Sequence, residues 1–343
     1  MRALELRAGP SLALVDRPRP RVEAEDDVVV RIVHSGICGT DRSILVGKFA
    51  AVEGTVLGHE SVGLVEAVGP AVEALQPGDR VIVNPTLYCG QCDACRAGRL
   101  NFCSEKRGNE IGIDRDGTFA DAFRVSARFL HRVPDDMSLE RAVMVEPLVC
   151  ALNNVRAGGL SVGETIIVLG GGPMGVITTM LALRIGAVAT LVEADPTRRE
   201  LCREILGGLD DERLTIVAPD APALAAGADV VVDSVGNLLE TAVPLARSAG
   251  RVVVMGFDSR ATATLKPLDI LMRGVRIIGA GDYDSAIFPL GVELARTLPL
   301  ERVVTDRLPL EKHEEAFARL SPQKGAPYGA MKVLLVSSPE DAS

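Results

Sequence analysis

The pattern of hydrophobic and polar positions changes near residue 165. Before that point, short β-branched runs lie between glycine and proline residues, and they include 28–33, 61–68 and 79–83. Runs of this length that alternate or are rich in β-branched residues are typical of strands. We therefore expect a β-rich barrel or sandwich in the first part of the chain.

From residue 165 onward, short apolar runs alternate with stretches of helical periodicity such as 174–185 and 197–206. The runs predict six strands, at 165–169, 189–193, 214–217, 229–233, 251–256 and 275–279. Strands that alternate with helices in this way predict an α/β fold with a doubly wound parallel sheet.

The last part of the chain returns to a mixed pattern, with a predicted helix at 310–320 and a strand at 331–336. We expect this part to rejoin the first domain. The predicted domains are therefore 1–148, 149–285 and a returning segment 286–343.

Composition and charge narrow the class of protein. The 343 residues include 37 Lys and Arg against 46 Asp and Glu, a net charge of −9, with 3% aromatic residues and no Trp. Nucleic-acid binding needs clustered positive charge and aromatic stacking platforms, so we expect no nucleic-acid partner.

No membrane segment or export signal is predicted. The first residues lack an apolar segment behind a basic start, so we expect a cytoplasmic protein. Residues 165–183 carry no charge, but glycines and Pro173 interrupt them, which suits a strand, a turn and a helix better than a membrane span.

The turn after the first of these six strands carries a glycine motif. Gly170, Gly172 and Gly175 fit G-x-G-x-x-G, and Pro173 and Met174 open the helix that follows. The first glycine allows the tight turn, the second lets the backbone approach a pyrophosphate, and the third lets helix and strand pack closely. A glycine-rich turn without a ligand is the alternative, and the surrounding strands argue against it.

An acidic residue follows at the expected distance. Glu193 comes 18 residues after Gly175, near the position of the acid that binds a ribose hydroxyl pair. A carboxylate there repels a 2′-phosphate, so we expect NAD(H) rather than NADP. Asp195 competes for this role, and Arg198 or Arg199 could line the adenosine pocket and allow some NADP use.

Four of the seven cysteines lie within fifteen residues, in a lobe at about 86–104: Cys89, Cys92, Cys95 and Cys103. Four thiolates match the closed tetrahedral shell of a structural zinc ion. An iron–sulfur cluster or a zinc knuckle could use similar spacing, although the acidic charge disfavours the knuckle. Cys150 and Cys202 are unaccompanied.

Short motifs at 36–41 (GICGTD), 58–60 (GHE) and 145–148 (VEPL), together with the cysteine lobe and the glycine turn, appear in one order along the chain. With these motifs in this order, the chain resembles the medium-chain zinc-dependent alcohol dehydrogenases. Within that family it most resembles the polyol (sorbitol) and L-threonine dehydrogenase branch. The resemblance covers essentially the whole chain. It implies a GroES-like catalytic domain, a Rossmann domain and a cleft between them.

The resemblance also implies a catalytic zinc ion. Cys38 and His59 match its ligands, and Glu60 matches a neighbouring carboxylate that is a ligand in the polyol branch. Glu146 matches a carboxylate of this branch that touches the metal or its water. One thiolate, one imidazole and one or two carboxylates would leave an open coordination position. Whether Glu60, Glu146 or water completes the shell stays open, and we interpret Cys150 as a packed thiol.

Thr40 matches the hydroxyl of the family's proton relay, although it could also cap the helix that starts near Asp41. The polyol and threonine enzymes generally have His five residues after the zinc cysteine, whereas this chain has Ser43. Proton release would therefore use Ser43, water or another base. The remaining histidines, His34, His131 and His313, are interpreted as structural, and Lys48, Phe49 and Glu110 could border the cleft.

The predicted function is that of a zinc-dependent oxidoreductase, which transfers a hydride between NAD(H) and a secondary alcohol or ketone such as a polyol, cyclitol or hydroxy-amino compound. Alternatives are a non-catalytic binding member of the fold, or an NAD-dependent carbonyl reductase or epimerase with the same metal site. The expected partners are a small-molecule substrate and further copies of the chain, as a homodimer or homotetramer.

Overall fold

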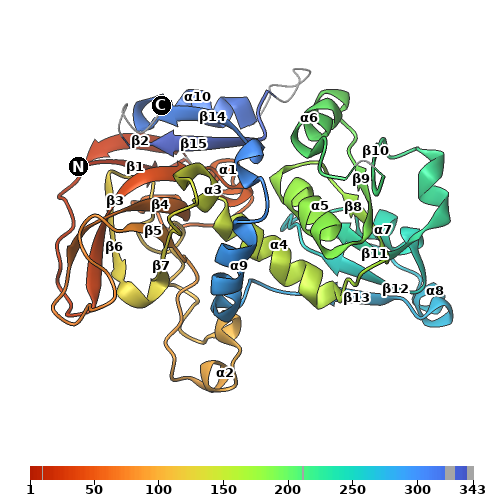
Figure 1. Ribbon diagram of the computed structural model, residues 1–343, viewed down its shortest axis with the longest axis horizontal. Helices are drawn as coiled ribbons and strands as arrows, with labels where there is room; N and C mark the ends of the chain where they lie inside the picture. The colour runs from red at the N-terminus through yellow and green to blue at the C-terminus, as the bar shows by residue number, and fades with distance from the viewer. Residues whose placement is uncertain (10, 211, 321–328, 338–343) are drawn as a thin grey trace. The chain divides into compact units, whose positions relative to one another are not determined.

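The computed structural model describes residues 1–9, 11–210, 212–320 and 329–337. Among these residues the chain forms two compact units (Figure 1). Unit 1 contains residues 1–146, 284–320 and 332–337, and unit 2 contains residues 147–283 and 329–331. The end of the predicted returning segment, 338–343, lies outside the described residues.

Unit 1 is built around a mixed sheet with the strand order β14-β15-β3-β4-β5-β7, and β6 also pairs with β3. A separate hairpin joins β1 and β2. The strands are β1 (Arg2–Arg7), β2 (Ser11–Asp16), β3 (Asp27–Gly36), β4 (Glu60–Val68), β5 (Arg80–Val83), β6 (Ala122–Ser126), β7 (Leu130–Arg132), β14 (Val304–Pro309) and β15 (Lys332–Val336).

Strand register places three segments together at one end of β3. Gly36 lies opposite Glu60 of β4 and opposite Leu334 of β15. The buried core of this sheet includes Val30, Ile32 and Val81, which hold the pairing because a one-residue slip would turn these side chains to the other face. The segment after β3 is therefore fixed between the starts of β4 and β15.

The helices of unit 1 are short: α1 (Gly39–Leu45), α2 (Asp93–Arg96), α3 (Leu139–Ala142), α9 (Phe288–Ala295) and α10 (His313–Leu320). The predicted helix at 310–320 is thus a 3-10 turn, Leu310–Lys312, followed by α10. The loop that carries α2 projects away from the strands (Figure 1).

Unit 2 contains one parallel sheet with the order β10-β9-β8-β11-β12-β13. This is the order of a doubly wound sheet, so the predicted fold class is confirmed. The strands are β8 (Thr165–Leu169), β9 (Val188–Val192), β10 (Leu214–Val217), β11 (Ala228–Asp233), β12 (Ala246–Val254) and β13 (Arg276–Gly279).

The helices of unit 2 are α5 (Pro173–Ile185), α6 (Pro196–Leu206), α7 (Leu239–Leu245) and α8 (Pro267–Arg273), and α4 (Val145–Gly158) begins at the boundary between the units. Helix α5 is apolar almost all round, and its residues 175–183 are buried. None of the helices in the described ranges has the length and apolar character that crossing a membrane requires.

Candidate metal and dinucleotide sites

The four cysteines of the lobe converge. The Sγ atoms of Cys89, Cys92, Cys95 and Cys103 all lie within 4.8 Å of one another. The Cys89–Cys95 and Cys92–Cys103 pairs are each 4.0 Å apart. Sulfurs at the corners of a tetrahedron with zinc–sulfur bonds of about 2.3 Å would be about 3.8 Å apart. The donor set therefore fits one zinc ion.

Backbone N–H groups lower the pKa of two of these thiols, Cys89 and Cys92, whereas burial raises the pKa of Cys95 to about 12. Helix α2 starts directly after Cys92, so Cys92 and Cys95 lie within one turn. Backbone N–H groups of Gln91 and Cys92 both lie 3.4 Å from the Cys89 Sγ. Backbone donors from Cys95 and Ser104 lower the pKa of the Cys92 thiol to about 6. A thiolate, the form that binds a metal ion, is thus accessible near neutral pH.

A second group joins Cys38, His59 and Glu60, whose ligand atoms also lie within 4.8 Å of one another. Cys38 precedes α1, while His59 and Glu60 lie at the start of β4. The pairing of Gly36 with Glu60 brings these two segments together. The sequence separates them by twenty residues, and the antiparallel sheet places them side by side.

Asp41, in the first turn of α1, lies next to this group. Its carboxylate is fully buried, and Oδ2 accepts a hydrogen bond from the Cys38 backbone N–H at 2.8 Å. Its Oδ1 lies 3.9 Å from His59 Nδ1, and neither atom has a hydrogen-bond partner among the described residues. A carboxylate that accepts the second ring N–H of a metal-binding imidazole orients the ring, and Asp41 faces this side of His59 without such a hydrogen bond in the described structure.

The electrostatics of the group favour a cation. Burial lowers the pKa of His59, but the negative charges of Cys38, Asp41 and Glu146 outweigh it and raise the pKa well above its ordinary value. The His59 imidazole, only 12% exposed and close to these anionic groups, lies at a point of strongly negative potential. A zinc ion, which prefers sulfur, nitrogen and carboxylate ligands, fits this donor set.

Lys332 is a site residue that the sequence analysis did not identify. Its Nζ donates to both carboxylate oxygens of Glu60, at 2.7 and 2.9 Å, and to the Ile37 carbonyl at 3.1 Å. Burial lowers the pKa of Lys332, and the charges of Glu60 and its neighbours outweigh that effect and raise it. The available signal was a lysine at the start of the apolar run KVLLV.

Thr40 and Ser43 are the predicted proton-relay residues, and both follow Cys38 closely in the chain. Thr40 Oγ1 is 3.7 Å from Cys38 Sγ. Thr40 is not the N-cap of α1, which was one predicted alternative. The N-cap residue is Cys38, and the Asp41 side chain completes the cap by accepting the Cys38 backbone N–H. Ser43 lies in the same helix, and its carbonyl accepts a hydrogen bond from the Lys48 backbone N–H at 2.8 Å.

Glu146 is buried at the start of α4, outside the set of three close ligands found among the described residues. Its charge still contributes to the raised pKa values of His59 and Lys332. Cys150 follows one turn later in α4 and belongs to neither ligand group.

The glycine loop has the geometry that its motif predicts. Gly170 has φ +100°, which favours glycine, and a Cβ on Gly175 would lie 1.8 Å from the Gly170 carbonyl oxygen. A Cβ on Gly172 would meet no atom within 4 Å. Gly172 precedes Pro173, the first residue of α5. The loop thus leaves open space in front of a helix N-terminus, where a phosphate can bind.

Glu193 lies directly after β9 rather than within it. Its Oε2 accepts the Gly171 backbone N–H at 2.8 Å, and its Oε1 accepts the Asp195 backbone N–H at 2.8 Å. Asp195 caps α6 through the Arg198 backbone N–H, at 2.7 Å. The Arg199 guanidinium donates to the carbonyls of Glu193 and Ala194.

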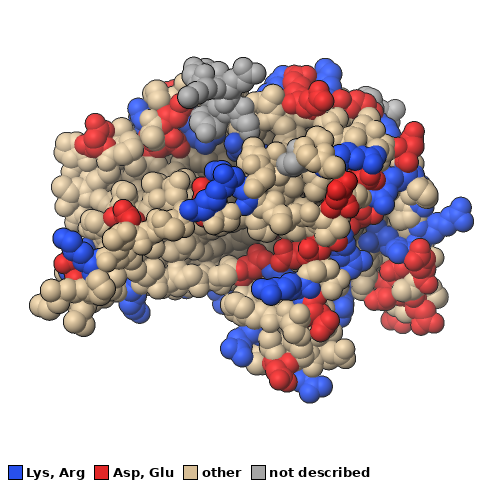
Figure 2. Space-filling view, turned by 180° about the vertical axis from the view of Figure 1, so that it is seen from behind, with Lys and Arg blue, Asp and Glu red and all other residues tan. Residues whose placement is uncertain are grey.

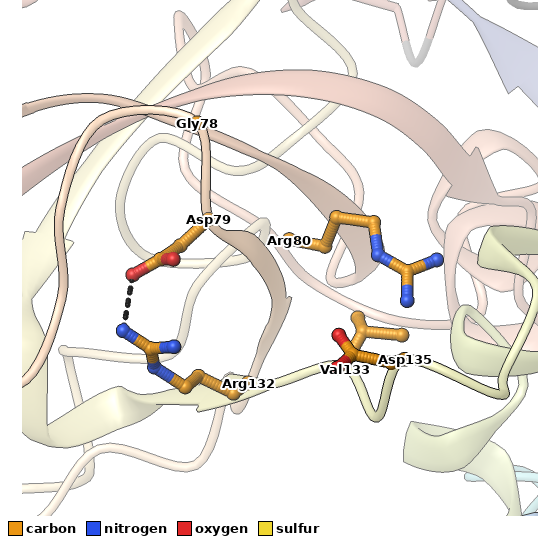
Figure 3. Close-up of a pocket in the computed structure, with 6 residues that line it drawn as sticks. All are labelled: Gly78, Asp79, Arg80, Arg132, Val133 and Asp135. Carbon is orange, nitrogen blue, oxygen red and sulfur yellow. Dashed lines mark hydrogen bonds and ion pairs between the residues drawn. The ribbon is translucent and has the colours of Figure 1, made fainter.

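Unit 1 also has a surface pocket of about 280 Å³ (Figure 3), lined by Gly78, Asp79, Arg80, Arg132, Val133 and Asp135. Arg132 forms an ion pair with Asp79 at 2.6 Å. Arg80 donates to the carbonyls of Met137 and Pro134. Both guanidinium groups are thus engaged. None of the residues predicted to bind a metal ion or the cofactor is among the six that line this pocket.

Charged side chains of both signs mix on the face drawn in Figure 2.

Comparisons with known proteins agree with the fold and place the chain among zinc-binding dehydrogenases. Residues 24–135 match the family model for the alcohol dehydrogenase GroES-like domain, and residues 173–296 match that for zinc-binding dehydrogenases. A 2-dehydro-3-deoxy-L-galactonate 5-dehydrogenase from Pseudoalteromonas atlantica is 31% identical, over 92% of each chain. A D-arabitol-phosphate dehydrogenase from Enterococcus avium is 29% identical, over 96% of this chain and 95% of the relative.

Among solved structures, a zinc-binding dehydrogenase from Sinorhizobium meliloti 1021 bound to NADP superimposes with a TM-score of 0.86. It has 28% sequence identity, and the match covers 98% of each chain.

The fold and the paired metal groups define a zinc-dependent oxidoreductase that uses a nicotinamide cofactor. The chain belongs to the medium-chain zinc-dependent alcohol dehydrogenase family, with the GroES-like and doubly wound domains that the resemblance implied.

Proposed function

We propose that this protein oxidises a secondary hydroxyl of a polyol-type substrate to a ketone with NAD as the hydride acceptor. The observation that carries the proposal is the group of Cys38, His59 and Glu60, with Thr40 beside Cys38. The two relatives named above act on a sugar acid and a polyol phosphate, which favours a hydroxyl-rich substrate.

Each residue of the group has a role in this proposal. Cys38, His59 and Glu60 would hold the zinc ion, and Asp41, 3.9 Å away on the Nδ1 side, would orient the His59 ring. A bound zinc ion supplies Lewis acidity, which lowers the pKa of a hydroxyl that it contacts. Thr40 would receive the substrate proton, and Ser43 or water would pass it to solvent. Cys89, Cys92, Cys95 and Cys103 would hold a structural zinc ion.

We assign the metal chemistry to the predicted domain 1–148 and the cofactor to the predicted domain 149–285. Gly170, Gly172 and Gly175, with Pro173 and Met174, would surround the pyrophosphate. The Glu193 carboxylate would bind the ribose hydroxyls and repel a 2′-phosphate, which supports NAD over NADP. Arg198 would border the adenosine. The Sinorhizobium meliloti structure is bound to NADP, so the same fold can also hold NADP.

The cofactor assignment is tested with Glu193→Gln. This change removes the negative charge but keeps the shape of the side chain. It should weaken NADH binding about tenfold, the range of a hydrogen bond to a charged group, and should weaken NADPH binding less. Glu200→Gln, on the exposed side of α6, is the control. Equal weakening of both cofactors would contradict the ribose assignment.

The whole proposal is tested by metal analysis and substrate screening. Zinc analysis should give two ions per chain. Cys38→Ser should remove one ion and the activity without unfolding the protein. Secondary alcohols, polyols, cyclitols and amino alcohols would be screened with NAD at 340 nm, followed by identification of the products. A protein that binds NADH but reduces none of the cofactor would favour a non-catalytic member, and an epimerised product would favour an epimerase.

We also propose a homodimer or homotetramer. Strand β13 is an edge of the parallel sheet, and Leu268, Leu271 and Met272 of the neighbouring α8 are 64–75% exposed. An exposed apolar helix beside an open strand edge is a common feature of protein interfaces. The cytoplasmic location stays a prediction.

A further inference from the structure

Two side chains form hydrogen bonds with the backbone of Gly171, the middle residue of the glycine loop. The Gly171 N–H donates to Glu193 Oε2 at 2.8 Å. Its carbonyl oxygen lies 3.3 Å from the Sγ of Cys202, which donates to it. Cys202 lies on α6, and Glu193 follows β9, so one short stretch of chain holds both ends of this residue.

The contact is also steric. A Cβ on Gly171 would lie 2.9 Å from Cys202 Sγ and 2.9 Å from Glu193 Cβ. Cys202 is completely buried. Its sulfur therefore fills the space beneath Gly171 and limits how far the loop backbone can move toward α6.

The thiol is a permanent donor. Burial, with a smaller contribution from the Glu193 charge, raises the pKa of Cys202 to about 12. It therefore stays protonated at neutral pH, and it lacks the thiolate character of a redox-active or nucleophilic cysteine.

We propose that Cys202 is a positioning residue of the dinucleotide site. By holding the Gly171 carbonyl, it keeps the Gly171 N–H directed at Glu193 and so keeps the Glu193 carboxylate in place for the adenosine ribose. This inference rests on the proposed cofactor site and deepens it. Without the S–H donor, the peptide between Gly171 and Gly172 loses a fixed partner. The backbone at Gly171 then gains freedom to turn its N–H away from Glu193 Oε2, which weakens one of the two backbone anchors of this carboxylate.

The test compares Cys202→Ala, which removes the donor, with Cys202→Ser, which keeps one. Dissociation constants for NADH and NADPH would be measured by fluorescence titration, with kcat, KM for NAD and thermal unfolding beside them. Cys202→Ala should raise the NADH constant about three- to tenfold, the range of one neutral hydrogen bond. The NADPH constant should change less, and kcat should not change. Cys202→Ser should return the NADH constant to within about twofold of wild type.

Ile205→Val is the matched control, because Ile205 is buried on the same helix and is not among the nearest neighbours of Gly171 in the described structure, which are Cys202 and Glu193. Ile205→Val should lower the melting temperature without changing the ratio of the NADH and NADPH dissociation constants. If Cys202→Ala fails to fold, Cys202→Val, which fills the space without a donor, takes its place.

A role that is only structural predicts a different result. Cys202→Ala would then lower the melting temperature and leave both dissociation constants unchanged, as in Ile205→Val, and that result would overturn the inference. A wild-type protein that binds neither NADH nor NADPH would instead overturn the proposed function. The two failures are therefore distinguishable.

Discussion

At the scale of single residues, the metal group depends on side chains that are themselves not metal ligands. Asp41 faces His59, and Lys332 holds both oxygens of Glu60. A buried carboxylate without its countercharge costs several kcal/mol, so these partners decide whether the ligands can stay buried.

The first prediction at this scale concerns the stability of the variant Lys332→Met. It leaves the Glu60 carboxylate buried and unpaired, which should lower the free energy of unfolding by about 3–5 kcal/mol in the presence of a chelator. Zinc should recover part of this loss, because the ion supplies a countercharge for Glu60. Chemical unfolding with and without zinc would measure both effects.

The control for this prediction is Lys312→Met, which changes an exposed lysine and should have little effect. A Lys332→Met protein as stable as wild type in chelator would show that the ion pair does not hold Glu60.

At the scale of elements, the lobe around α2 has little core of its own apart from its four cysteines. Its short helix and turns close around these sulfurs, and Phe102 is 60% exposed. Small metal-bound segments of this kind gain their folding free energy from the metal ion.

Cys92→Ser should therefore remove one zinc ion per chain and lower the melting temperature. The ion of the Cys38 group should remain bound. Zinc analysis and thermal unfolding would measure this, with Cys150→Ser as the control that keeps both ions. Loss of both ions in Cys92→Ser would show that the two groups are not independent.

A second element-scale prediction concerns the returning segment of unit 1. Arg141 of α3 holds both oxygens of Glu301 at 2.6 Å, and this pairing lowers the pKa of the Glu301 carboxyl below its ordinary value of 4.5. The stabilisation is therefore present above pH 4.5 and is lost as the pH falls through the lowered value.

Glu301→Gln should remove this contribution, about 0.5–1 kcal/mol because solvent screens the pair. The difference in unfolding free energy from wild type should shrink as the pH falls below about 4.5. Glu315→Gln, which loses an exposed pair with Arg319, is the control and should show a smaller difference. A difference between Glu301→Gln and wild type that stays constant from pH 7 to pH 3 would contradict the prediction.

At the scale of the whole molecule, the exposed apolar face of α8 predicts self-association. Leu271 is 74% exposed. A charge at this position should oppose burial in an interface. Leu271→Lys should therefore reduce the molar mass of the protein in solution, measured by sedimentation or light scattering. Val162→Lys, at a position that is 79% exposed on unit 2, is the control. An unchanged mass in Leu271→Lys would place the interface elsewhere.

Much of the fold follows from local patterns. The six runs after residue 165 became the six strands of the parallel sheet, with ends that differ by a few residues and one strand, β12, that begins earlier, at Ala246. The spacing of the lobe cysteines and of the glycine loop also acts over short distances, within one turn or one loop. Local periodicity and short spacing determine such features because their physics is local.

The contacts of the sites were decided by the tertiary structure. The pairing of Glu60 with Lys332 joins residues 272 positions apart, and the contact of Cys202 with Gly171 depends on how α6 packs beneath the glycine loop. Sheet register and helix packing bring these groups together, and neither can be read from the residues that flank each one. The sequence thus determined which ligand types the chain carries, and the tertiary structure decided which buried charges and donors hold them in place.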